Sequence, residues 1–531
     1  MDIGVKDWLL AFSGIILIRF LIEAISDPRT SGIISSDPQA LIHGLLFYLV
    51  ATVGSMLIID YFTKQGIKTA NFMIFFLCFM WVAPVLDFIL SKGKGFQLAY
   101  ISDSGLNLVR DFFTFGGPTL YRGATLGIRF ELALIFFGLS WFVWQKTKNL
   151  KKSIATFVIS YVFVFIISAL PGIIYTSSSI ISGVSMAQNG TPGYITNLIS
   201  GSNISFNSVR ASLIPYSRNE FLEIGFDKLM SQFYFIILSG LLFLWFWRNK
   251  KNTLVAILKN SRPERAGHYI ILVLLGIWSG YVAGFGRISS WVDTLGIICL
   301  VISWYTMWIF SVNLNDLEDL TIDRISNKNR PLVQNTVTEK EMSQSVLIFL
   351  CISLLGSWSA GYYPFFMSLV CISASYIYSV SPLRLKLVPI ISTFLMALAS
   401  LASILAGFFF ISQNKIFYSF SPLAMFGILV CYTLLFNVKD LKDVEGDRAE
   451  DCYTIPVIFG EKRGQKIIGI MFALSFLLLP IFFSDAVLFV LSIPASVIGY
   501  ILITKYPRKE KSFFILYFVY ILLGVILHFP L

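Results

Sequence analysis

The chain carries two short acidic segments in which the aspartates have the same spacing. The first reads Asn315-Asp316-Leu317-Glu318-Asp319-Leu320-Thr321-Ile322-Asp323, and the second reads Asp440-Leu441-Lys442-Asp443-Val444-Glu445-Gly446-Asp447. In each segment the aspartates occur at i, i+3 and i+7, which places them on one stripe if the segment is helical. Like charges on a stripe repel one another unless positive charge lies among them. A hard divalent cation is the natural source of that charge in an apolar chain, and an oxygen-only set of ligands favours Mg²⁺.

The composition of the chain is that of a polytopic membrane protein. Of its 531 residues, 56% are hydrophobic and only 13% are charged, a balance that excludes a soluble domain of this size. The net charge is +11, but the lysines and arginines lie in short loops between apolar segments, where they orient the chain in a membrane. We therefore expect contact with membrane lipids and no nucleic-acid partner. The six cysteines form no C-x-x-C pair and the three histidines lie far apart, which argues against a disulfide framework, a zinc site or a histidine-based triad.

The hydropathy pattern predicts about fifteen transmembrane helices of roughly 20 apolar residues each. Six precede a basic stretch from Arg248 to Arg265 and centre on residues 8–25, 41–60, 71–90, 128–144, 154–173 and 232–247. Nine follow it, near residues 268–285, 292–311, 345–359, 364–379, 388–411, 422–437, 466–483, 486–503 and 512–528. The first apolar stretch lacks a basic leader and a convincing cleavage site, so we expect it to be a retained helix, as in a prokaryotic plasma-membrane protein.

The basic loops predict the orientation of these helices. The loops that contain Lys64, Lys146 to Lys152, Arg248 to Arg265, Arg324 to Lys340, Arg384 to Lys386, Lys439 to Lys466 and Lys505 to Lys511 all fall on one side of the count. The positive-inside rule makes that side cytoplasmic. The N-terminus and both acidic segments are then cytoplasmic, and the C-terminus is external. The stretch from Arg248 to Arg265 is also the expected boundary between two domains, residues 1–250 and 251–531.

Basic and polar residues surround the two acidic segments. The first segment is followed by Asn327-Lys328-Asn329-Arg330-Pro331-Leu332, the second by Thr454-Ile455-Pro456-Val457, and Tyr378-Ser379-Val380-Ser381-Pro382-Leu383-Arg384-Leu385-Lys386 lies between them. Carboxylates that hold metal ions, metal ions that hold phosphate oxygens, and basic groups that cover the remaining charge together make a diphosphate site. One acidic segment alone could equally be a solvated loop that caps a helix end. Two segments with matched spacing beside a basic segment favour the diphosphate site.

On these motifs, residues from about 255 to 531 resemble the UbiA superfamily of intramembrane prenyltransferases. The first segment matches the family pattern N-D-x-x-D-x-x-x-D followed by N-R-P-L, and the second matches D-x-x-D-x-x-G-D followed by T-x-P-x-x-x-G. The middle segment matches Y-S-x-P-P-x-R-L-K except that Ser381 stands where the first proline is usual. The resemblance implies an all-α fold with a nine-helix prenyltransferase bundle. In this chain that bundle is preceded by a six-helix transmembrane module of unknown function.

The resemblance also implies a role for individual residues. The Mg²⁺ ligands would be Asn315, Asp316, Asp319, Asp323, Asp440, Asp443 and Asp447. The catalytic residues would be Asp316, Asp319, Asp440, Asp443, Tyr378 and Lys386, and the residues that bind substrate would be Asn315, Arg330, Arg384 and Lys439. Arg384 and Lys386 could instead be anchors at the membrane interface.

The chemistry implied by the resemblance is the ionisation of an allylic prenyl diphosphate. Mg²⁺ and basic groups stabilise the departing diphosphate, aromatic faces shelter the cation, and an acceptor captures it. The second acidic segment looks most like that of members that prenylate glycerol-phosphate lipids or chlorophyllide, so a lipid acceptor ranks ahead of an aromatic one. Two alternatives remain: phosphoribosyl transfer onto a polyprenyl phosphate, and a cation-coupled lipid transporter, whose carboxylates would lie nearer the bilayer midplane.

Residues 1–250 contain no catalytic motif but place five ionisable residues at membrane depth: Arg19, Glu23, Asp87, Arg129 and Glu131. Charges in the membrane are costly and usually pair with one another or line a cavity. They predict either structural ion pairs or an outward polar pocket for a lipid headgroup or sugar.

Overall fold

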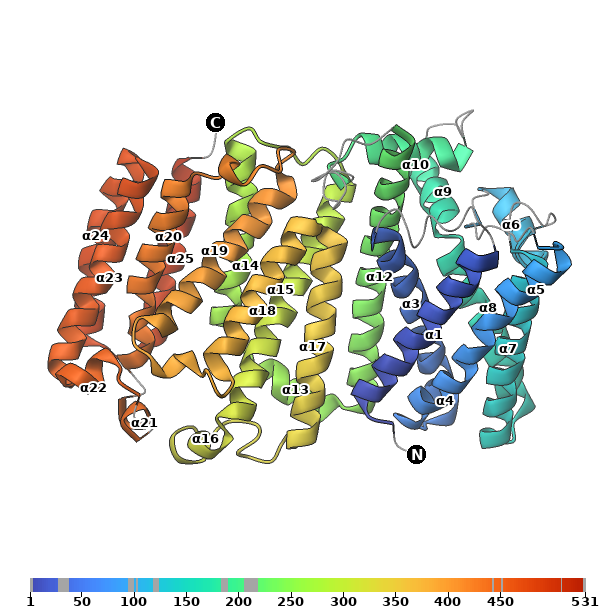
Figure 1. Ribbon diagram of the computed structural model, residues 1–531, viewed down its shortest axis with the longest axis horizontal. Coiled ribbons are helices and arrows are strands. Elements are labelled where there is room, and N and C mark those ends of the chain that lie inside the picture. Colours follow the sequence, from blue (N-terminus) through green and yellow to red (C-terminus); the bar gives the residue numbers. More distant parts are fainter. Residues whose placement is uncertain are drawn as a thin grey trace. The chain divides into compact units, whose positions relative to one another are not determined.

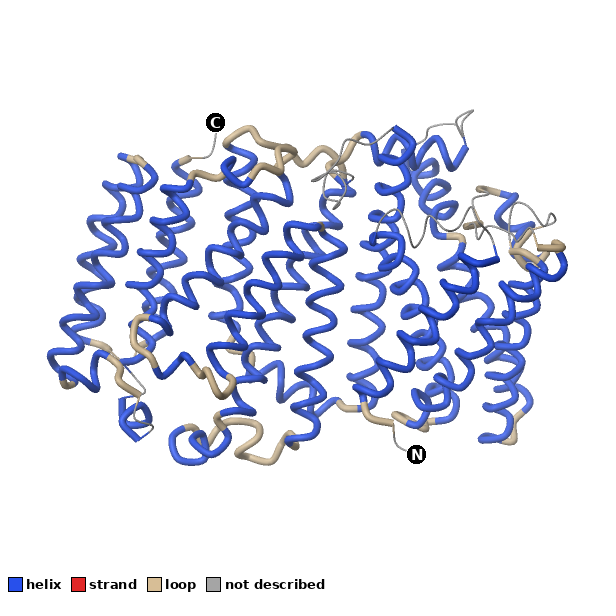
Figure 2. Tube along the Cα trace, viewed as in Figure 1, coloured by secondary structure: helices blue, strands red, loops and turns tan. Residues whose placement is uncertain are grey.

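The computed structural model describes residues 3–26, 38–93, 100–101, 104–117, 124–182, 190–204, 218–441, 444–449, 452–507 and 509–528. Within these residues every regular element is helical and no strand occurs (Figure 2). Thirteen of the described helices are long and apolar enough to cross a membrane. The chain is therefore an all-α polytopic membrane protein, as its composition predicts.

The chain divides into two compact units. The first comprises residues 1–251 with 289–296, and the second comprises residues 252–288 with 297–531. The helices of the first unit are α1 (Val5–Ser26), α3 (Pro38–Thr63), α4 (Lys68–Leu77), η1 (Cys78–Trp81), α5 (Val82–Leu90), α6 (Leu106–Phe113), α7 (Leu126–Thr147), α8 (Leu150–Ser168), α9 (Leu170–Ser182), α10 (Gly190–Ser200) and α12 (Arg218–Asn249). The six spans predicted for this part coincide with α1, α3, the α4–η1–α5 run, α7, α8 and α12. The hydropathy pattern did not predict α6, α9 or α10.

The ionisable residues buried in the first unit contact one another or the backbone. The Nε of Arg19 lies 2.8 Å from a carboxylate oxygen of Glu23, and its Nη1 lies 2.8 Å from one of Glu131. Asp87 accepts hydrogen bonds from a threonine hydroxyl and a backbone amide at the start of α7. Arg129 donates to backbone carbonyl groups. Arg19, Glu23 and Glu131 are therefore joined by ion pairs, whereas Asp87 and Arg129 are held by hydrogen bonds.

The second unit contains more helices, most of them long. They are α13 (Lys251–Asn260), α14 (Pro263–Val282), α15 (Trp291–Glu318), α16 (Leu320–Ser326), α17 (Glu339–Ala360), α18 (Tyr362–Ser379), η3 (Leu385–Leu387), α19 (Ile391–Ile411), η4 (Phe417–Ser419), α20 (Pro422–Leu435), η5 (Phe436–Leu441), α21 (Val444–Ala449), α22 (Ile455–Phe459), α23 (Glu461–Phe483), α24 (Ala486–Lys505) and α25 (Glu510–Leu527). The nine spans predicted here coincide with α14, α15, α17, α18, α19, α20, α23, α24 and α25, which lie side by side in Figure 1.

Local sequence signals mark where several of these helices begin. Thr338 and Glu341 form a capping box at the start of α17, in which each side chain accepts from the other residue's backbone amide. Prolines occupy the first turn of α14 and α20, where the missing amide hydrogen would have no partner in the helix. Asp485 caps α24 by accepting from the amide of Leu488 at 2.9 Å.

Helices α14 and α19 cross at the centre of the second unit with their backbones in close approach. A Cβ atom added to Gly407 of α19 would lie 1.9 Å from the carbonyl oxygen of Val273, and one added to Gly276 of α14 would lie 2.0 Å from that of Ile404. Only glycine fits at both positions, a device common where helices pack inside membranes. The crossing fixes two helices that also line the cavity described below.

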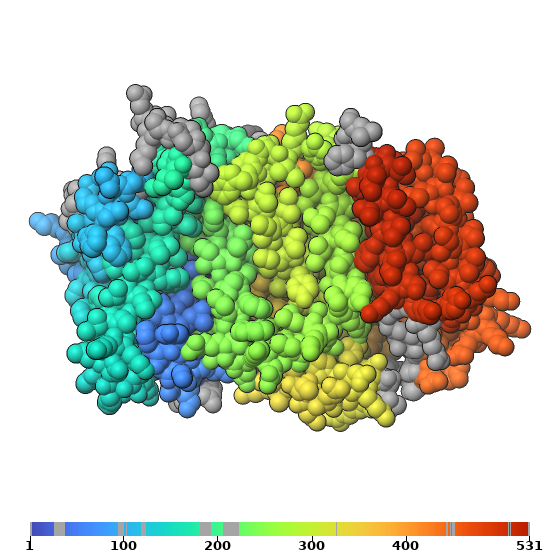
Figure 3. Space-filling view, turned by 180° about the vertical axis from the view of Figure 1, so that it is seen from behind, coloured from blue at the N-terminus to red at the C-terminus, as the bar shows by residue number. Residues whose placement is uncertain are grey.

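The short elements of the second unit gather at one end of its bundle. In Figure 1, α13, α16, α21 and α22 all lie at the end opposite the C-terminus. Residues around 320–340, yellow in Figure 3, project there as a lobe. Its apolar base is a buried cluster from α13, α15, α17 and the intervening loop, made of Ile257, Ile309, Leu332, Val337 and Met342. Both acidic segments therefore belong to the same end of the bundle.

Candidate active site

The first acidic segment spans a helix junction. Helix α15 ends at Glu318 and α16 begins at Leu320, so Asp319 lies between them. The condition under which the three aspartates share one helical stripe is therefore met only in part, because the helix is interrupted at Asp319. The interruption coincides with ion pairs that hold the side chain of Asp319. The amide of Asp319 still donates to the carbonyl of Asn315 at 3.0 Å, and the amide of Asp323 donates to the carbonyl of Asp319 at 2.8 Å. Because the turn is kept, all three aspartates still line one cavity.

The second acidic segment also departs from a single α-helix. Asp440 lies in η5, a 3₁₀ helix that follows α20 directly, and the chain becomes α-helical again only at Val444. The tighter 3₁₀ turn replaces the α-helical spacing on which the predicted stripe depended. Asp443 lies outside the described residues, and Asp447 is described only by its backbone in α21, so neither of these two side chains has a described position.

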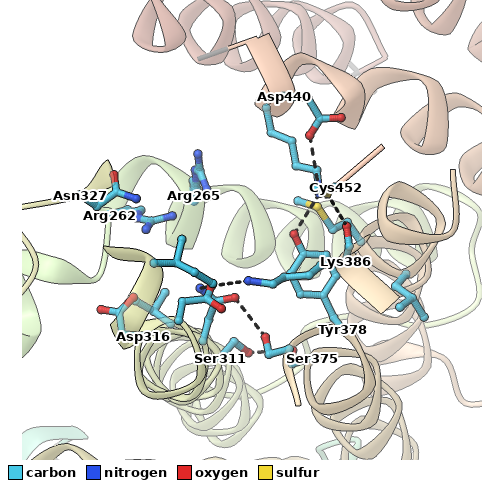
Figure 4. Close-up of a pocket in the computed structure, with 18 of the residues that line it drawn as sticks. Arg262, Arg265, Ser311, Asp316, Asn327, Ser375, Tyr378, Lys386, Asp440 and Cys452 are labelled. Atoms are coloured by element: carbon cyan, nitrogen blue, oxygen red, sulfur yellow. Dashed lines mark hydrogen bonds and ion pairs between the residues drawn. The ribbon is translucent and has the colours of Figure 1, made fainter. Parts of the chain in front are cut away.

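A cavity of about 680 Å³ joins the two acidic segments. Its walls contain nine of the predicted site residues, which are Asn315, Asp316, Asp319, Asp323, Arg330, Tyr378, Lys386, Lys439 and Asp440. Figure 4 shows Lys386 and Tyr378 between Asp316 on one side and Asp440 on the other. Arg384 is not among the residues that line the cavity, but its guanidinium group contacts the carboxylate of Asp319, which does line it. The structure thus brings together groups that lie more than a hundred residues apart in the sequence.

Arg330 neutralises two aspartates of the first segment. Its Nη1 lies 3.0 Å from Oδ1 of Asp316, and its Nε lies 3.8 Å from Oδ2 of Asp323. The other oxygen of Asp316 accepts a hydrogen bond of 2.6 Å from the side-chain amide of Asn260, on α13. The sequence predicted positive charge among these aspartates, and Arg330 supplies part of it.

Asp319 contacts two cations from the middle basic segment. Nη2 of Arg384 lies 2.8 Å from Oδ1 of Asp319, and Nζ of Lys386 contacts Oδ2. The amide of Asn315 also donates to Oδ2, at 2.9 Å. Both basic side chains therefore reach the acidic cluster in this structure.

Lys439 connects the second acidic segment to Tyr378. Its Nζ donates to the Tyr378 hydroxyl at 2.9 Å, lies 4.9 Å from the centre of that ring, and is 3.9 Å from Oδ1 of Asp440. This contact closes the cavity between α18 and η5.

The cavity continues into an apolar part between the long helices. Trp308 on α15 and Tyr269 on α14 have ring centroids 5.3 Å apart, and Leu395, Met396 and Ala399 of α19 complete this wall. Trp308 precedes Asp316 by eight residues, which corresponds to about 12 Å along a helix. The cavity is therefore polar at the bundle end and apolar farther inside.

Sequence reasoning missed several residues that line the cavity, among them Arg262, Arg265, Asn327, Glu445 and Glu461. The Arg262-Pro-Glu-Arg265 run was interpreted only as part of a domain boundary. Its position at the start of α14 was a usable signal, because helix ends at this face meet the acidic segments. Asn260 gave no sequence signal of its own.

The electrostatics of Asp323 reflect its position on α16, outside the membrane-spanning helices. Burial raises the pKa of this carboxyl group above its ordinary value, and the nearby charge of Asp319 raises it further. The Asn327 amide, which donates to Oδ1 at 2.8 Å, opposes the rise because it stabilises the charged form. Any additional positive charge in the cavity therefore stabilises the charged form of the Asp323 carboxyl group.

The donor set fits a hard divalent cation that arrives with its substrate. Oδ1 of Asp316 and Oδ2 of Asp323 are buried and accept no hydrogen bond, although each faces Arg330. Within the described ranges, no three His, Cys, Asp or Glu side chains lie close enough to hold a metal ion by themselves. Mg²⁺ is commonly held by one or two carboxylates, with water and substrate phosphates completing its octahedron. The residues present match that mode of binding.

Comparison with known proteins identifies the family of the second unit. Residues 272–522 match the model of the UbiA prenyltransferase family. Digeranylgeranylglyceryl phosphate synthase of Pyrococcus abyssi is 26% identical over 41% of this chain and 74% of its own length. Chlorophyll synthase of Avena sativa is 27% identical over 33% of this chain and 47% of its own length. A solved structure of a UbiA homolog from Archaeoglobus fulgidus, bound to GPP and Mg²⁺, aligns with 52% of this chain and 98% of its own, at 19% identity and a TM-score of 0.43.

The matched region is thus an intramembrane enzyme of the prenyltransferase class. Residues 272–522 are therefore the part of the chain that matches the UbiA prenyltransferase family, and the relatives named above are similar to this chain over much of that part.

Proposed function

We propose that this protein is a Mg²⁺-dependent intramembrane prenyltransferase that moves a prenyl group from a prenyl diphosphate to a membrane-associated acceptor, preferably a lipid of the glycerol-phosphate type. One observation carries the proposal. A single cavity of about 680 Å³ combines carboxylates and basic groups at the bundle end with apolar and aromatic side chains farther inside. A prenyl diphosphate has the same two parts, a multiply charged head and an apolar chain.

The polar part of the cavity suits the diphosphate. Asp316, Asp319, Asp323 and Asp440 would hold Mg²⁺. Asp443 and Asp447, whose side chains are not described, are further candidates. Mg²⁺ bound there would neutralise charge that develops on the leaving diphosphate. Arg330 and Lys386 now contact carboxylates. We expect them to turn toward phosphate oxygens, which take charge-assisted hydrogen bonds in the same geometry. Lys439 and Tyr378 would close the site behind the substrate.

The apolar part suits the prenyl chain and its cation. Cleavage of the bond between C1 and oxygen leaves the electron pair on the diphosphate and an allylic cation on the chain. The faces of Tyr269 and Trp308 offer negative quadrupole density to that cation, and the surrounding helices keep water away from it. The acceptor hydroxyl then bonds to C1, and its proton passes to the departing diphosphate, which balances the transfer.

The position of the site favours a cytoplasmic location. The bundle end that carries the acidic segments also carries the start of α17, with Lys340, and the end of α24, with Lys505. Basic residues accumulate on the cytoplasmic side of membrane proteins. We place the protein in this orientation in a prokaryotic plasma membrane, with separate roles for residues 1–250 and residues 251–531. The curated relatives named digeranylgeranylglyceryl phosphate synthase support the lipid acceptor over an aromatic one.

The two alternative functions receive less support. The carboxylates lie at helix ends beside basic groups, whereas the coupling residues of transporters lie near the midplane. A phosphoribosyl diphosphate would also suit the polar part of the cavity. Its sugar is polar, however, so it would not need the apolar part that contains Tyr269 and Trp308.

The test is diphosphate release by the purified full-length chain, with geranylgeranyl diphosphate, Mg²⁺ and a panel of acceptors. Asp316→Asn and Asp440→Asn should each lower the rate at least a hundredfold and leave the protein folded, because each removes a charged group from the site. Asp485→Asn is the matched control. Asp485 caps α24 at the other end of the bundle, and asparagine caps equally well. Release from phosphoribosyl diphosphate alone, or cation-coupled lipid movement without release, would contradict the proposal.

A further inference from the structure

A chain of hydrogen bonds in the first unit joins four side chains and one backbone carbonyl group. Nδ1 of His43, on α3, lies 2.8 Å from Oδ1 of Asp227, on α12. Nε2 of His43 contacts the hydroxyl group of Tyr100. The hydroxyl group of Tyr234, also on α12, lies 3.0 Å from that of Tyr100 and 2.9 Å from the carbonyl oxygen of Ile167, on α8. Four hydrogen bonds therefore follow one another in a row.

The carbonyl group at the end of this chain is available because of a proline. The residue four positions after Ile167 is Pro171, which has no amide hydrogen to complete the helical hydrogen bond. Helix α8 ends at Ser168, whose carbonyl accepts from the amide of Ile101 at 3.2 Å. The break between α8 and α9 thus supplies acceptors both to the hydrogen-bond chain and to the backbone next to Tyr100.

The four hydrogen bonds need one hydrogen more than the neutral side chains possess. A carboxylate can only accept, so Nδ1 of His43 must donate to Asp227. A neutral histidine then has no second ring hydrogen, and Tyr100 and Tyr234 contribute one each, which makes three hydrogens for four bonds. An added proton turns His43 into an imidazolium that donates from both nitrogens. Tyr100 then donates to Tyr234, and Tyr234 donates to Ile167, so that every bond has its hydrogen.

The charges around this chain are compatible with the added proton. Titratable groups beside it on α12, α3 and α1 are Glu223, Lys228, Tyr48, Arg19 and Glu23. Lys228 donates to the side-chain oxygen of Gln39 at 3.2 Å, and Arg19 is paired with Glu23 at 2.8 Å. Both cations are therefore engaged with partners of their own, whereas the carboxylate of Asp227 contacts the histidine directly and stabilises a positive charge on it.

We propose that His43 and Asp227 form a proton-binding site in the first unit, and that the bound proton ties the segment Tyr100–Ile101 to α8 and α12. The two side chains are 11% and 24% exposed, so a proton reaches them from the surface of the unit. When the proton leaves, one of the four bonds loses its hydrogen and two lone pairs face each other. Tyr100 is the member of the chain that lies outside a helix, so it is the group that moves away. The inference does not depend on the proposed prenyltransferase function.

The same residues could instead form a polar network that is always neutral and only holds the helices together. Its histidine would carry one ring hydrogen at every pH, and the backbone next to Tyr100 would be protected equally at every pH. The two cases therefore differ in the number of hydrogens on His43 and in the exchange rate of the Ile101 amide. Both quantities can be measured on the full chain.

The first measurement is ring-nitrogen NMR of the full chain in detergent, with isotope-labelled histidine. The chain contains three histidines, and the His43 signals are those that His43→Gln removes. We expect both ring nitrogens of His43 to carry hydrogen at a pH of about 5, and one of them to lose it reversibly as the pH rises to about 8, the range in which histidine changes charge. Signals of a neutral imidazole over that whole range would overturn the inference.

The second measurement is hydrogen exchange of the Ile101 amide, which donates to Ser168. After correction for the intrinsic pH dependence of exchange, we expect the rate to rise about fivefold once His43 has lost its proton, which is the effect of one hydrogen bond. Tyr100→Phe removes the hydroxyl group that joins His43 to Tyr234. It leaves two hydrogen bonds, which neutral side chains can fill, so exchange at Ile101 should no longer respond to the titration of His43.

Tyr161→Phe is the matched control in the same unit. It removes a hydroxyl group from α8 that donates to the carbonyl of Phe112, within the apolar cluster that contains Ile101 but outside the hydrogen-bond chain. We expect this variant to keep the wild-type response to pH. An undiminished response in Tyr100→Phe would overturn the inference. Loss of the response in both tyrosine variants would also overturn it, because a general loosening of the unit would then explain the effect.

Discussion

The crossing of α14 and α19 allows the effect of a single methyl group to be worked out. In Gly407→Ala, the new Cβ atom would lie 1.9 Å from the carbonyl oxygen of Val273 and 2.9 Å from the amide nitrogen of Ile277. Real Cβ contacts are rarely shorter than 3.0 Å, so the two backbones must separate by about 1 Å. No flexible side chain can yield in their place. Overpacking of this kind lowers the free energy of unfolding by about 1–3 kcal/mol. We expect a value near the upper end of that range, because the two helices are rigid.

The cost should be visible both in stability and in catalysis. A loss of about 3 kcal/mol corresponds to a decrease in apparent Tm of roughly 6–12 °C for a unit of this size, measured at one scan rate in one detergent because unfolding is often irreversible. Tyr269 on α14 and Met396 on α19 both line the cavity. Separation of the two helices should therefore lower prenyl transfer as well.

Gly267→Ala provides the matched control, on α14, which is the other helix of the crossing. Its added Cβ atom would have Phe518 Cζ as nearest neighbour, at 3.9 Å, which is an ordinary contact. In a helix interior the change from glycine to alanine is then favourable by up to about 1 kcal/mol. If the apparent Tm of the Gly407→Ala protein fell no further than that of the Gly267→Ala protein, the close crossing of the two backbones would be contradicted.

Three further predictions concern the cavity. Arg330→Gln should reduce activity at least tenfold, and Arg330→Lys should restore little of it, because a lysine cannot reach both Asp316 and Asp323 with one planar group; single-turnover rates measure this. Burial raises the pKa of Asp323, so its contribution to the stability of the metal-free protein is present at low pH and is lost as pH rises through the raised pKa. Stabilisation by Mg²⁺ with pyrophosphate should follow the opposite trend, growing with pH, and Asp323→Asn should flatten both trends in thermal unfolding. Ala399 lines the apolar part of the cavity, so Ala399→Phe should shorten the prenyl chain that the cavity accepts. The ratio of kcat/KM for geranyl diphosphate to kcat/KM for geranylgeranyl diphosphate should then rise. An unchanged ratio would show that Ala399 does not limit chain length.

Much of the fold could be predicted from the sequence because hydropathy is a local property. A run of about 20 apolar residues must be helical in a membrane, since no water is present to satisfy its backbone groups. All fifteen predicted spans accordingly coincide with described helices, of which thirteen are long and apolar enough to cross a membrane, and both acidic segments lie at helix ends. Short helices such as α9 and α10 were missed because they are too short or too polar to give that signal.

The sequence by itself determined the family motifs and the chemical types of the site residues, which are carboxylates, lysines and arginines at helix ends. The tertiary structure decided how they meet. The break in the helix at Asp319, the pairing of Arg330 with Asp316, and the arrival of Asn260 from α13 all depend on where separate helices cross. Those crossings are set in part by backbone contacts at Gly276 and Gly407. Spacing along the chain cannot encode such contacts, because residues far apart in sequence are brought together only by packing.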